Sequence, residues 1–187
     1  MIVCGRRKMN ITVYLGANTG CRQEYIEKTK ELGTWIGNNG HTLVYGGGAP
    51  GLMGILADSV LDSGGKVIGV IPEFMVLKGR KHPRLSETYV TETMSERRDK
   101  MIELGDVYIA VPGGVGTLDE ISEVIAAKRL GLHHNPCIFY NVDGYYDPMK
   151  KMLKEMTEAE FLSVEDADAV LFPENLEQLA AFLKADH

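Results

Sequence analysis

The fold of this chain is decided by the stretch Val107-Tyr108-Ile109-Ala110-Val111-Pro112-Gly113-Gly114-Val115-Gly116-Thr117-Leu118-Asp119-Glu120. Its first five residues form an apolar run typical of a buried strand, and the pattern from Leu118 to Leu130 predicts a helix. A glycine-rich turn between the two gathers backbone N–H groups at a helix N-terminus, which suits a phosphate. The carboxylate of Glu120 lies one turn into that helix. The stretch therefore predicts an α/β unit that acts on a phosphorylated small molecule.

Strand and helix patterns alternate along the rest of the chain. Residues 73–88 have no clear periodicity and are expected to form a loop or a short helical lid. Such repeated βα units predict a mainly parallel sheet with helices on both faces, and ligands of such sheets bind at the carboxyl ends of the strands. The expected strands cover residues 11–16, 42–45, 66–71, 89–91, 107–111, 136–141 and 169–172, and the expected helices cover residues 22–38, 52–62, 94–104, 118–130, 146–156 and 173–185.

Length and composition predict an ordinary globular protein. The chain has 187 residues, 44% hydrophobic and 25% charged, which fits one domain over residues 10–187 after a short extension at residues 1–9. The net charge of −6 argues against a nucleic-acid partner, although the basic clusters at residues 78–84 and 97–100 suit small anions. The sequence has no apolar run long enough for a membrane span and no signal-peptide core, so a cytoplasmic location is expected.

Cysteines and histidines give no sign of a metal centre. Cys4, Cys21 and Cys137 are widely spaced and predict free thiols of a reducing compartment. His133 and His134 are adjacent, so they cannot share a helix face, and no carboxylate is suitably spaced beside them. We expect neither a metal nor a resident cofactor.

A second glycine-rich turn follows the expected strand at residues 42–45. Gly46, Gly48 and Gly51 fit the G-x-G-x-x-G spacing of a dinucleotide-binding turn, with Glu73 about twenty residues further on. The turn follows the second expected strand rather than the first, and little chain is left for a catalytic domain. The hypothesis of a nicotinamide-dependent oxidoreductase therefore depends on this spacing alone. The other interpretation is a tight turn in which the helix and the strand pack closely.

Glu120 has two interpretations from the residues alone. Thr117-Leu118-Asp119-Glu120 matches a capping box, in which Thr117 is the N-cap and Glu120 reaches back to it, and this stretch alone favours capping slightly over catalysis. Arg97 and Arg98 favour catalysis, because they are expected in the first turns of a helix opened by a capping box at residues 93–96. Cations there oppose the helix dipole, which points to an anionic partner, either a phosphate or Glu120. A solvated surface pair is the alternative.

The motifs together resemble the LOG (Lonely Guy) family, which has often carried the label "possible lysine decarboxylase". Residues 112–120 are similar to its PGGxGTxxE motif, and residues 94–98 to its MxxRK segment. Residues 45–54 resemble its YGGGxxGLMG segment, residues 13–18 its opening strand and turn, and residues 141–146 its NVDGYY run. The resemblance covers nearly the whole chain, and the first two motifs in this order are highly specific.

The resemblance implies a Rossmann-like, doubly wound fold and a homodimer. It implies a phosphoribohydrolase that cleaves the N-glycosidic bond of a nucleoside 5′-monophosphate, such as AMP or a cytokinin ribotide, to a free base and ribose 5-phosphate. By motif match, Arg97 and Glu120 take the catalytic positions. The implied substrate-binding residues are Arg98, Gly113, Gly114, Gly116 and Thr117, together with Gly46, Gly47 and Gly48 of the earlier turn.

The sequence also departs from the family pattern. Gly79 stands where the family often has an acidic residue thought to contact substrate, Ala126-Ala127 replaces a Thr-Trp pair, and Ala17-Asn18 replaces serines. Arg98 replaces the usual lysine and keeps its charge. These departures leave the base preference open. A non-catalytic nucleotide sensor or carrier on the same fold stays the alternative, because a fold does not determine a function. The chain is short for a pyridoxal phosphate enzyme, which disfavours a literal lysine decarboxylase.

Overall fold

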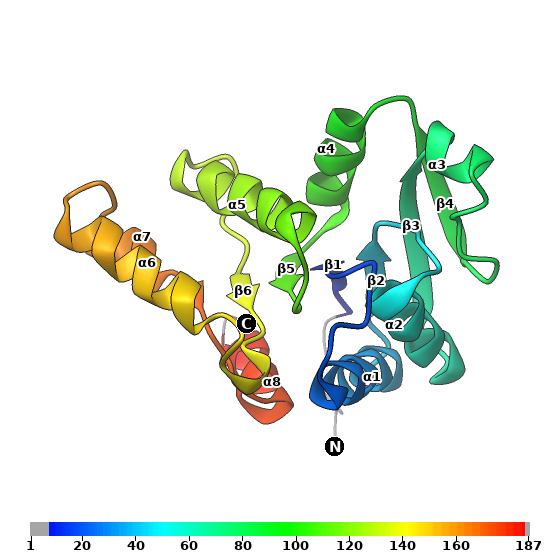
Figure 1. Cartoon of the computed structure of the whole chain (residues 1–187), viewed down its shortest axis with the longest axis horizontal. Helices are drawn as coiled ribbons and strands as arrows, with labels where there is room; N and C mark the ends of the chain where they lie inside the picture. Colours follow the sequence, from blue (N-terminus) through cyan, green and yellow to red (C-terminus); the bar gives the residue numbers. More distant parts are fainter. Residues whose placement is uncertain (1–7, 186–187) are drawn as a thin grey trace, which may run out of the picture.

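Seven parallel strands form one sheet in the computed structural model, which describes residues 8–185 (Figure 1). The strand order is β4-β3-β2-β1-β5-β6-β7, so the chain winds outward from β1 to β4 and then returns to β5 on the other side of β1. The doubly wound, Rossmann-like architecture is confirmed. The strands are β1 (Asn10–Tyr14), β2 (Thr42–Tyr45), β3 (Lys66–Pro72), β4 (Glu87–Thr91), β5 (Val107–Ala110), β6 (Cys137–Phe139) and β7 (Val170–Leu171).

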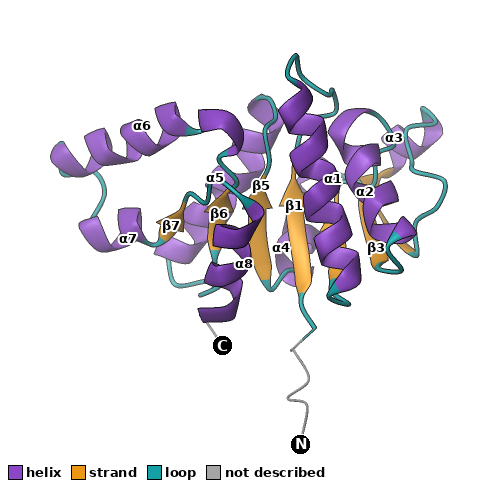
Figure 2. Ribbon diagram, turned by 90° about the horizontal axis from the view of Figure 1, so that it is seen from below, coloured by secondary structure: helices purple, strands orange, loops and turns teal. Residues whose placement is uncertain are grey.

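Helices cover both faces of the sheet. Figure 2 shows α1, α2 and α8 on one face and α4 and α5 on the other, while α6 extends beyond the edge that carries β7. The helices are α1 (Gln23–Asn38), α2 (Gly51–Asp62), α3 (Glu73–Leu77), α4 (Met94–Leu104), α5 (Val115–Arg129), α6 (Asp147–Glu158), α7 (Val164–Asp168) and α8 (Leu176–Ala185), with a short 3₁₀ turn η1 (Val142–Gly144) before α6.

The core is divided into two clusters by the sheet. Successive side chains of a strand point to opposite faces, so Ile11 and Val13 of β1 pack with α1 and α2, whereas Tyr14 packs in the cluster that contains residues of α4 and α5. All three side chains are almost fully buried. The two clusters fix the carboxyl ends of β1 and β5 side by side, and this edge of the sheet positions the site.

Most observed elements match the expected ones apart from shifts of a few residues at their ends, and the larger differences concern helices. Helix α5 begins at Val115, three residues before the expected start, and α8 begins at Leu176, so Pro173 precedes that helix instead of lying in its first turn. Helix α7 was not expected. Residues 73–88, expected as a loop or a short helical lid, contain the short helix α3, a loop and the beginning of β4.

The remaining expectations concern the termini, the thiols and the membrane. Residues 1–7 of the expected extension, including Cys4, lie outside the described residues, and Met9 is buried against the core. Cys21 and Cys137 are free thiols. Between residues 8 and 185, no helix combines the length and the apolar character that crossing a membrane requires.

Candidate active site

Three glycine-rich turns meet where the strand order switches. Gly16 follows β1, Gly46 and Gly48 follow β2, and residues 113–116 follow β5, and all three turns line one cavity of about 660 Å³. Ligands of doubly wound sheets bind at this point, because the connections after β1 and β5 run to opposite faces of the sheet and leave a crevice. The volume is in the usual range for a small-molecule site.

Arg97 and Glu120 form a buried ion pair in this cavity. Nη1 of Arg97 lies 2.5 Å from Oε1 of Glu120. Nε of Arg97 donates a hydrogen bond to the carbonyl of Val70 at 3.1 Å. Only 9% of the Arg97 side chain and 12% of the Glu120 side chain are exposed. Buried charges are costly unless they are paired, so each residue holds the other in place. The structure thus brings together the two residues that the motif match marks as catalytic.

Two opposing effects act on the carboxyl group of Glu120. Burial raises the pKa of this carboxyl, and the guanidinium of Arg97 offsets only part of the increase. A carboxyl group with a raised pKa inside a cleft is typical of functional sites.

Glu120 does not cap helix α5. The N-cap residue is Gly114, and Thr117 lies inside the first turn, where its backbone N–H bonds the Gly114 carbonyl at 3.1 Å. The capping-box prediction for Thr117 and Glu120 is wrong because the helix starts within the glycine-rich turn. The carboxylate is therefore available to Arg97.

The N-terminus of α5 lies beside this pair in the same cavity and has the geometry that suits an anion. The first N–H groups of a helix have no partner within the helix, and the helix dipole favours an anion there. A Cβ on Gly114 or Gly116 would meet no atom within 4 Å, so open space lies over these residues. Glu120 follows Gly116 by four residues and lies on the same side of the helix. The N-terminus of α5 and the carboxylate of Glu120 therefore line the same cavity.

Close packing explains several glycines of this site. A Cβ on Gly113 would lie 2.1 Å from Oγ1 of Thr117, and one on Gly46 would lie 2.1 Å from Nη2 of Arg97. Gly47 has a φ of +71° and packs against Ile71 instead of lining the cavity. The turn after β2 is therefore tight mainly because α4 and β3 approach it closely.

Arg98 lies outside the cavity. Its Nε is 2.7 Å from the carboxylate of Glu123, and its Nη1 is 3.3 Å from that of Asp119. Both acids belong to α5, so Arg98 ties α4 to α5 on the outer side. The structure does not bring Arg98 to the substrate position that the resemblance implies.

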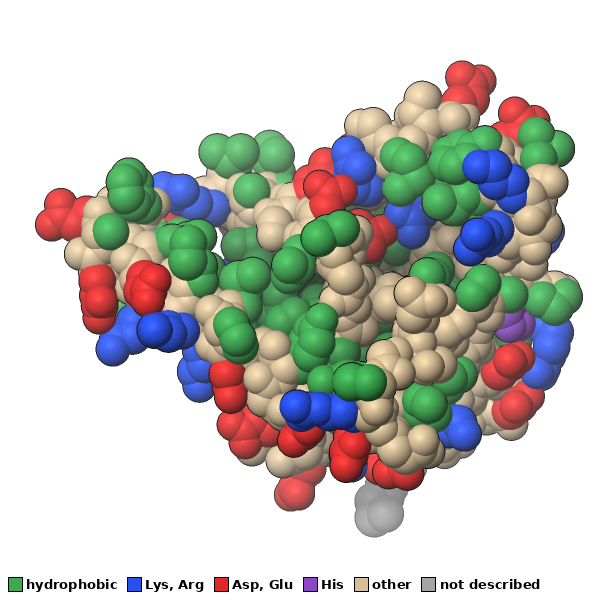
Figure 3. Space-filling view, in the orientation of Figure 1, with side chains coloured by type: hydrophobic (Ala, Val, Ile, Leu, Met, Phe, Trp, Pro, Cys, Tyr) green, Lys and Arg blue, Asp and Glu red, His purple; other side chains and the backbone are tan. Residues whose placement is uncertain are grey.

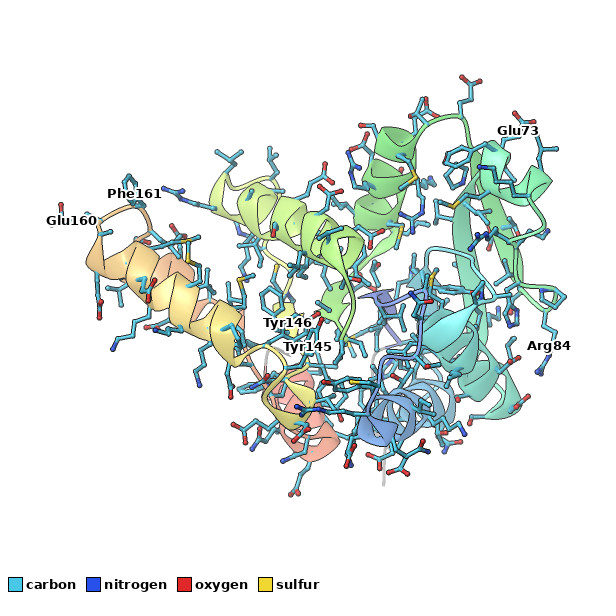
Figure 4. All side chains as sticks on the ribbon, viewed as in Figure 1. Glu73, Arg84, Tyr145, Tyr146, Glu160 and Phe161 are labelled. Atoms are coloured by element: carbon cyan, nitrogen blue, oxygen red, sulfur yellow. The ribbon has the colours of Figure 1, made fainter. Side chains whose placement is uncertain are left out.

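Two tyrosines of the 141–146 run support the turn after β5 (Figure 4). The hydroxyl of Tyr145 donates to the carbonyl of Gly113 at 2.5 Å, and that of Tyr146 donates to the carbonyl of Val111 at 2.9 Å. Tyr145 also lines the cavity. The resemblance of residues 141–146 to a family motif did not indicate the contact of these tyrosines with the glycine-rich stretch.

Sequence reasoning missed the apolar wall of the cavity. Met53, Phe74, Met75 and Met94 line it, and they come from three different helices. Scattered methionines usually fill core gaps, so they gave no signal, and only the predicted lid at residues 73–88 pointed to this wall. The same segment contributes Lys78 and Arg80 from the basic cluster. Within residues 8–185 no three His, Cys, Asp or Glu side chains gather as a metal site would require.

Comparison with known proteins identifies a family model and relatives that match this chain. The family model described as "Possible lysine decarboxylase" matches residues 53–183. A cytokinin riboside 5′-monophosphate phosphoribohydrolase of Rhodococcoides fascians is 38% identical over 94% of this chain and 89% of its own length. The cytokinin riboside 5′-monophosphate phosphoribohydrolase LOG of Oryza sativa subsp. japonica is 39% identical over 88% of this chain and 68% of its own length.

Solved structures share the fold. A molybdenum cofactor binding protein from Rippkaea orientalis superimposes with a TM-score of 0.72 at 21% identity, over 96% of this chain and 98% of that chain. The Moco carrier protein of Chlamydomonas reinhardtii has a TM-score of 0.72 at 23% identity, over 96% of this chain and 97% of that chain. At this level of sequence identity, the structural similarity shows a shared fold and nothing further.

Proposed function

The chain belongs to the LOG-type family of cytokinin riboside 5′-monophosphate phosphoribohydrolases, and on that premise we propose that it hydrolyses nucleoside 5′-monophosphates of the AMP or cytokinin ribotide type to a free base and ribose 5-phosphate. One observation carries the proposal. A buried carboxylate, Glu120, is paired with Arg97 and lies one helical turn beyond the glycine-rich turn at residues 113–116.

The geometry suits cleavage of an N-glycosidic bond. In the proposed complex, the 5′-phosphate binds the backbone N–H groups of residues 113–117, and this contact fixes the ribose beside Glu120. Glycoside cleavage passes through an oxocarbenium-like sugar, which a carboxylate stabilises or attacks through an activated water. Binding energy from the phosphate, which does not react, then orients the reacting carbon. Arg97 keeps Glu120 in position and partly offsets the rise in its pKa.

We assign roles to the predicted residues accordingly. Arg97 and Glu120 are the catalytic residues, and Gly113, Gly114, Gly116 and Thr117 form the phosphate site. Gly46 and Gly48 border the cavity and leave room for Arg97 and Met53. Arg98 and Gly47 contribute through packing of the surrounding elements.

Replacing the carboxylate tests the proposal. Glu120→Gln keeps the shape of the side chain but removes its charge, so it should lose most of the hydrolysis, by about a hundred-fold or more, while it still binds nucleotide. The assay incubates the protein with several nucleoside monophosphates and separates free base and ribose 5-phosphate by chromatography. Glu123→Gln is the matched control, because Glu123 lies on the same helix and faces Arg98.

Two outcomes would contradict the proposal. Full activity of Glu120→Gln would remove Glu120 from the mechanism. Binding of nucleotides by the parent protein without release of base from any of them would favour the sensor or carrier on the same fold.

We further propose that the protein is a cytoplasmic homodimer that acts on a free nucleotide, without nucleic acid or membrane as partner. A second, mainly apolar cavity supports the dimer. It measures about 640 Å³ and lies between α5 and α6, with Leu130 and Met152 on its rim. These two residues are 75% and 47% exposed, and Phe161, in the loop that follows α6, is 77% exposed (Figure 4). Clustered exposed hydrophobic side chains mark interaction surfaces.

A further inference from the structure

The glycine-rich turn after β5 leaves its N–H groups free for a ligand. The N–H groups of residues 113–116 donate to no acceptor between residues 8 and 185, and these four residues line the cavity. The turn is open at the surface, where Figure 3 shows backbone in tan beside the start of α5. An anion binds to such donors, whereas a carbonyl oxygen turned toward it would repel it. The affinity of this turn for phosphate therefore depends on the direction in which each peptide group points.

The carbonyl groups of the same turn are held by donors of the protein. The carbonyl of Pro112 accepts a hydrogen bond from the N–H of Gly16 at 3.2 Å, and that of Gly114 accepts from N–H groups in the first turn of α5 at 3.1 and 3.2 Å. The carbonyl of Gly113, between these two, accepts from the hydroxyl of Tyr145 at 2.5 Å. Backbone groups thus hold two of the three carbonyls, and one side chain holds the third.

The peptide group between Gly113 and Gly114 has the most conformational freedom in this turn. It lies between two glycines, which adopt more backbone conformations than other residues. Every peptide bond between residues 8 and 185 is trans, so the carbonyl and the N–H of this group point in opposite directions. Rotation of the group as a unit would exchange the two and present the Gly113 oxygen to a ligand. The Tyr145 hydroxyl opposes this rotation, because it holds the oxygen and leaves the N–H on the other side.

The ring of Tyr145 is supported by its neighbours. It makes edge contacts with the ring of Tyr25, at a centroid distance of 5.6 Å, and with that of Tyr146, at 4.9 Å. Figure 4 shows both labelled tyrosines where the start of α6 faces the turn after β5. Asp143, two residues earlier, is ion-paired with Arg22 beside the start of α1. The hydroxyl is therefore presented by a supported side chain, and such preorganisation lowers the entropy cost of binding.

We propose that Tyr145 is a positioning residue of the phosphate site, which acts by locking the peptide group between Gly113 and Gly114. In the complex, the N–H of Gly114 donates to a phosphate oxygen, and the Tyr145 hydroxyl stays on the opposite side of the peptide group. A rotated peptide group would lose this donor and add a repelling oxygen. The inference rests on the proposed function, since it takes the phosphate of a nucleotide to bind this turn.

Tyr146 offers a matched comparison in the same turn. Its hydroxyl donates to the carbonyl of Val111 at 2.9 Å. The next residue is Pro112, which has no N–H, so this peptide group has no donor to offer an anion. Tyr145→Phe and Tyr146→Phe each remove one hydroxyl that binds the turn, but only the first releases a peptide group with an N–H.

Binding of ribose 5-phosphate tests the inference without the reaction. Calorimetry should give a Kd about ten-fold higher for Tyr145→Phe than for the parent protein, because the Gly114 donor is no longer held toward the phosphate. Tyr146→Phe should keep the Kd within about two-fold but lower Tm by about 2–4 °C, because its hydroxyl bond is buried. Inorganic phosphate, used as a second probe, should show the same difference between the variants.

Kinetics separate positioning from general damage to the protein. Tyr145→Phe should lower kcat/KM for AMP about ten-fold but keep that for adenosine, which has no phosphate, within about two-fold. Absence of base release from every nucleotide, with the difference in Kd between the variants intact, would overturn the proposed function alone. The role of Tyr145 would be overturned if the parent does not bind ribose 5-phosphate, if Tyr145→Phe binds it as tightly as the parent, or if Tyr146→Phe weakens binding equally.

Discussion

The absence of a side chain at Gly46 leaves the space that the Arg97 guanidinium needs to reach Glu120. Because a Cβ at this position would lie 2.1 Å from Nη2 of Arg97, Gly46→Ala should displace the guanidinium from the carboxylate. Loss of a hydrogen bond between charged groups typically costs about 1.5–3 kcal/mol, so kcat/KM should fall about ten- to hundred-fold. Steady-state kinetics with a nucleoside monophosphate measure the effect.

A double-mutant cycle identifies the cause of this loss. If Gly46→Ala acts through the Arg97–Glu120 pair, it should have little further effect when Glu120 is already Gln. Equal losses in both backgrounds, or an unchanged activity of Gly46→Ala, would contradict the account.

Single residues show how far the sequence could predict the site. The motif match selected Arg97 and Glu120, and the cations near a helix N-terminus correctly indicated an anionic partner for Arg97. The cap assigned to Thr117 was wrong, because a glycine can be an N-cap and the local pattern does not show where the first turn closes. The contact of Tyr145 with Gly113 joins residues 32 positions apart, and no local pattern encodes it.

At the scale of elements, the N-terminus of α4 positions Arg97. Oγ1 of Thr93 accepts a hydrogen bond from the N–H of Glu96 at 3.1 Å, and this capping was predicted. Thr93→Ala should cost about 1 kcal/mol of stability, which corresponds to about 2–4 °C in Tm for a chain of this size. Thermal unfolding measures the change, and Thr93→Ser should keep the cap. A Tm of Thr93→Ala equal to that of the parent would show that the cap adds no stability.

Most elements were predictable because their patterns are local, and the exceptions have physical reasons. Pro173 was expected inside a helix, but its carbonyl accepts a hydrogen bond from the N–H of Asn141 at 2.8 Å. The side chain of Asn175 accepts from the N–H of Gln178 at 3.0 Å, so Asn175 caps the helix two residues after Pro173. Helix α7 has five residues, which is too short for a periodic pattern.

At the scale of the whole molecule, the sequence predicted the parallel sheet but not the order of its strands. The alternation of strands and helices requires parallel strands, whereas the neighbours of β1 depend on contacts between distant segments. The glycine-rich turns could still be assigned to one edge, because they all follow carboxyl ends of parallel strands. The opposite wall of the cavity, with Lys78 and Arg80, depends on tertiary packing.

The proposed homodimer is also a property of the whole molecule. Light scattering should give twice the chain mass of 20.6 kDa. Met152→Glu places a charge on the apolar rim of the cavity between α5 and α6 and should shift the protein toward the monomer. Lys151→Glu is the control, because the Lys151 side chain is 78% exposed and lies outside this cavity. A monomeric parent protein would contradict the proposal.

The central claim is that phosphate binding at the N-terminus of α5 places the ribose of a nucleotide at Glu120. The most direct measurement compares base release from each monophosphate with that from its own nucleoside, using AMP with adenosine and a cytokinin ribotide with its riboside. The account predicts that kcat/KM for each monophosphate exceeds that for its nucleoside by about a hundred-fold or more, because the phosphate contacts orient the reacting carbon. Equal values for monophosphate and nucleoside, or faster release from the nucleosides, would contradict it.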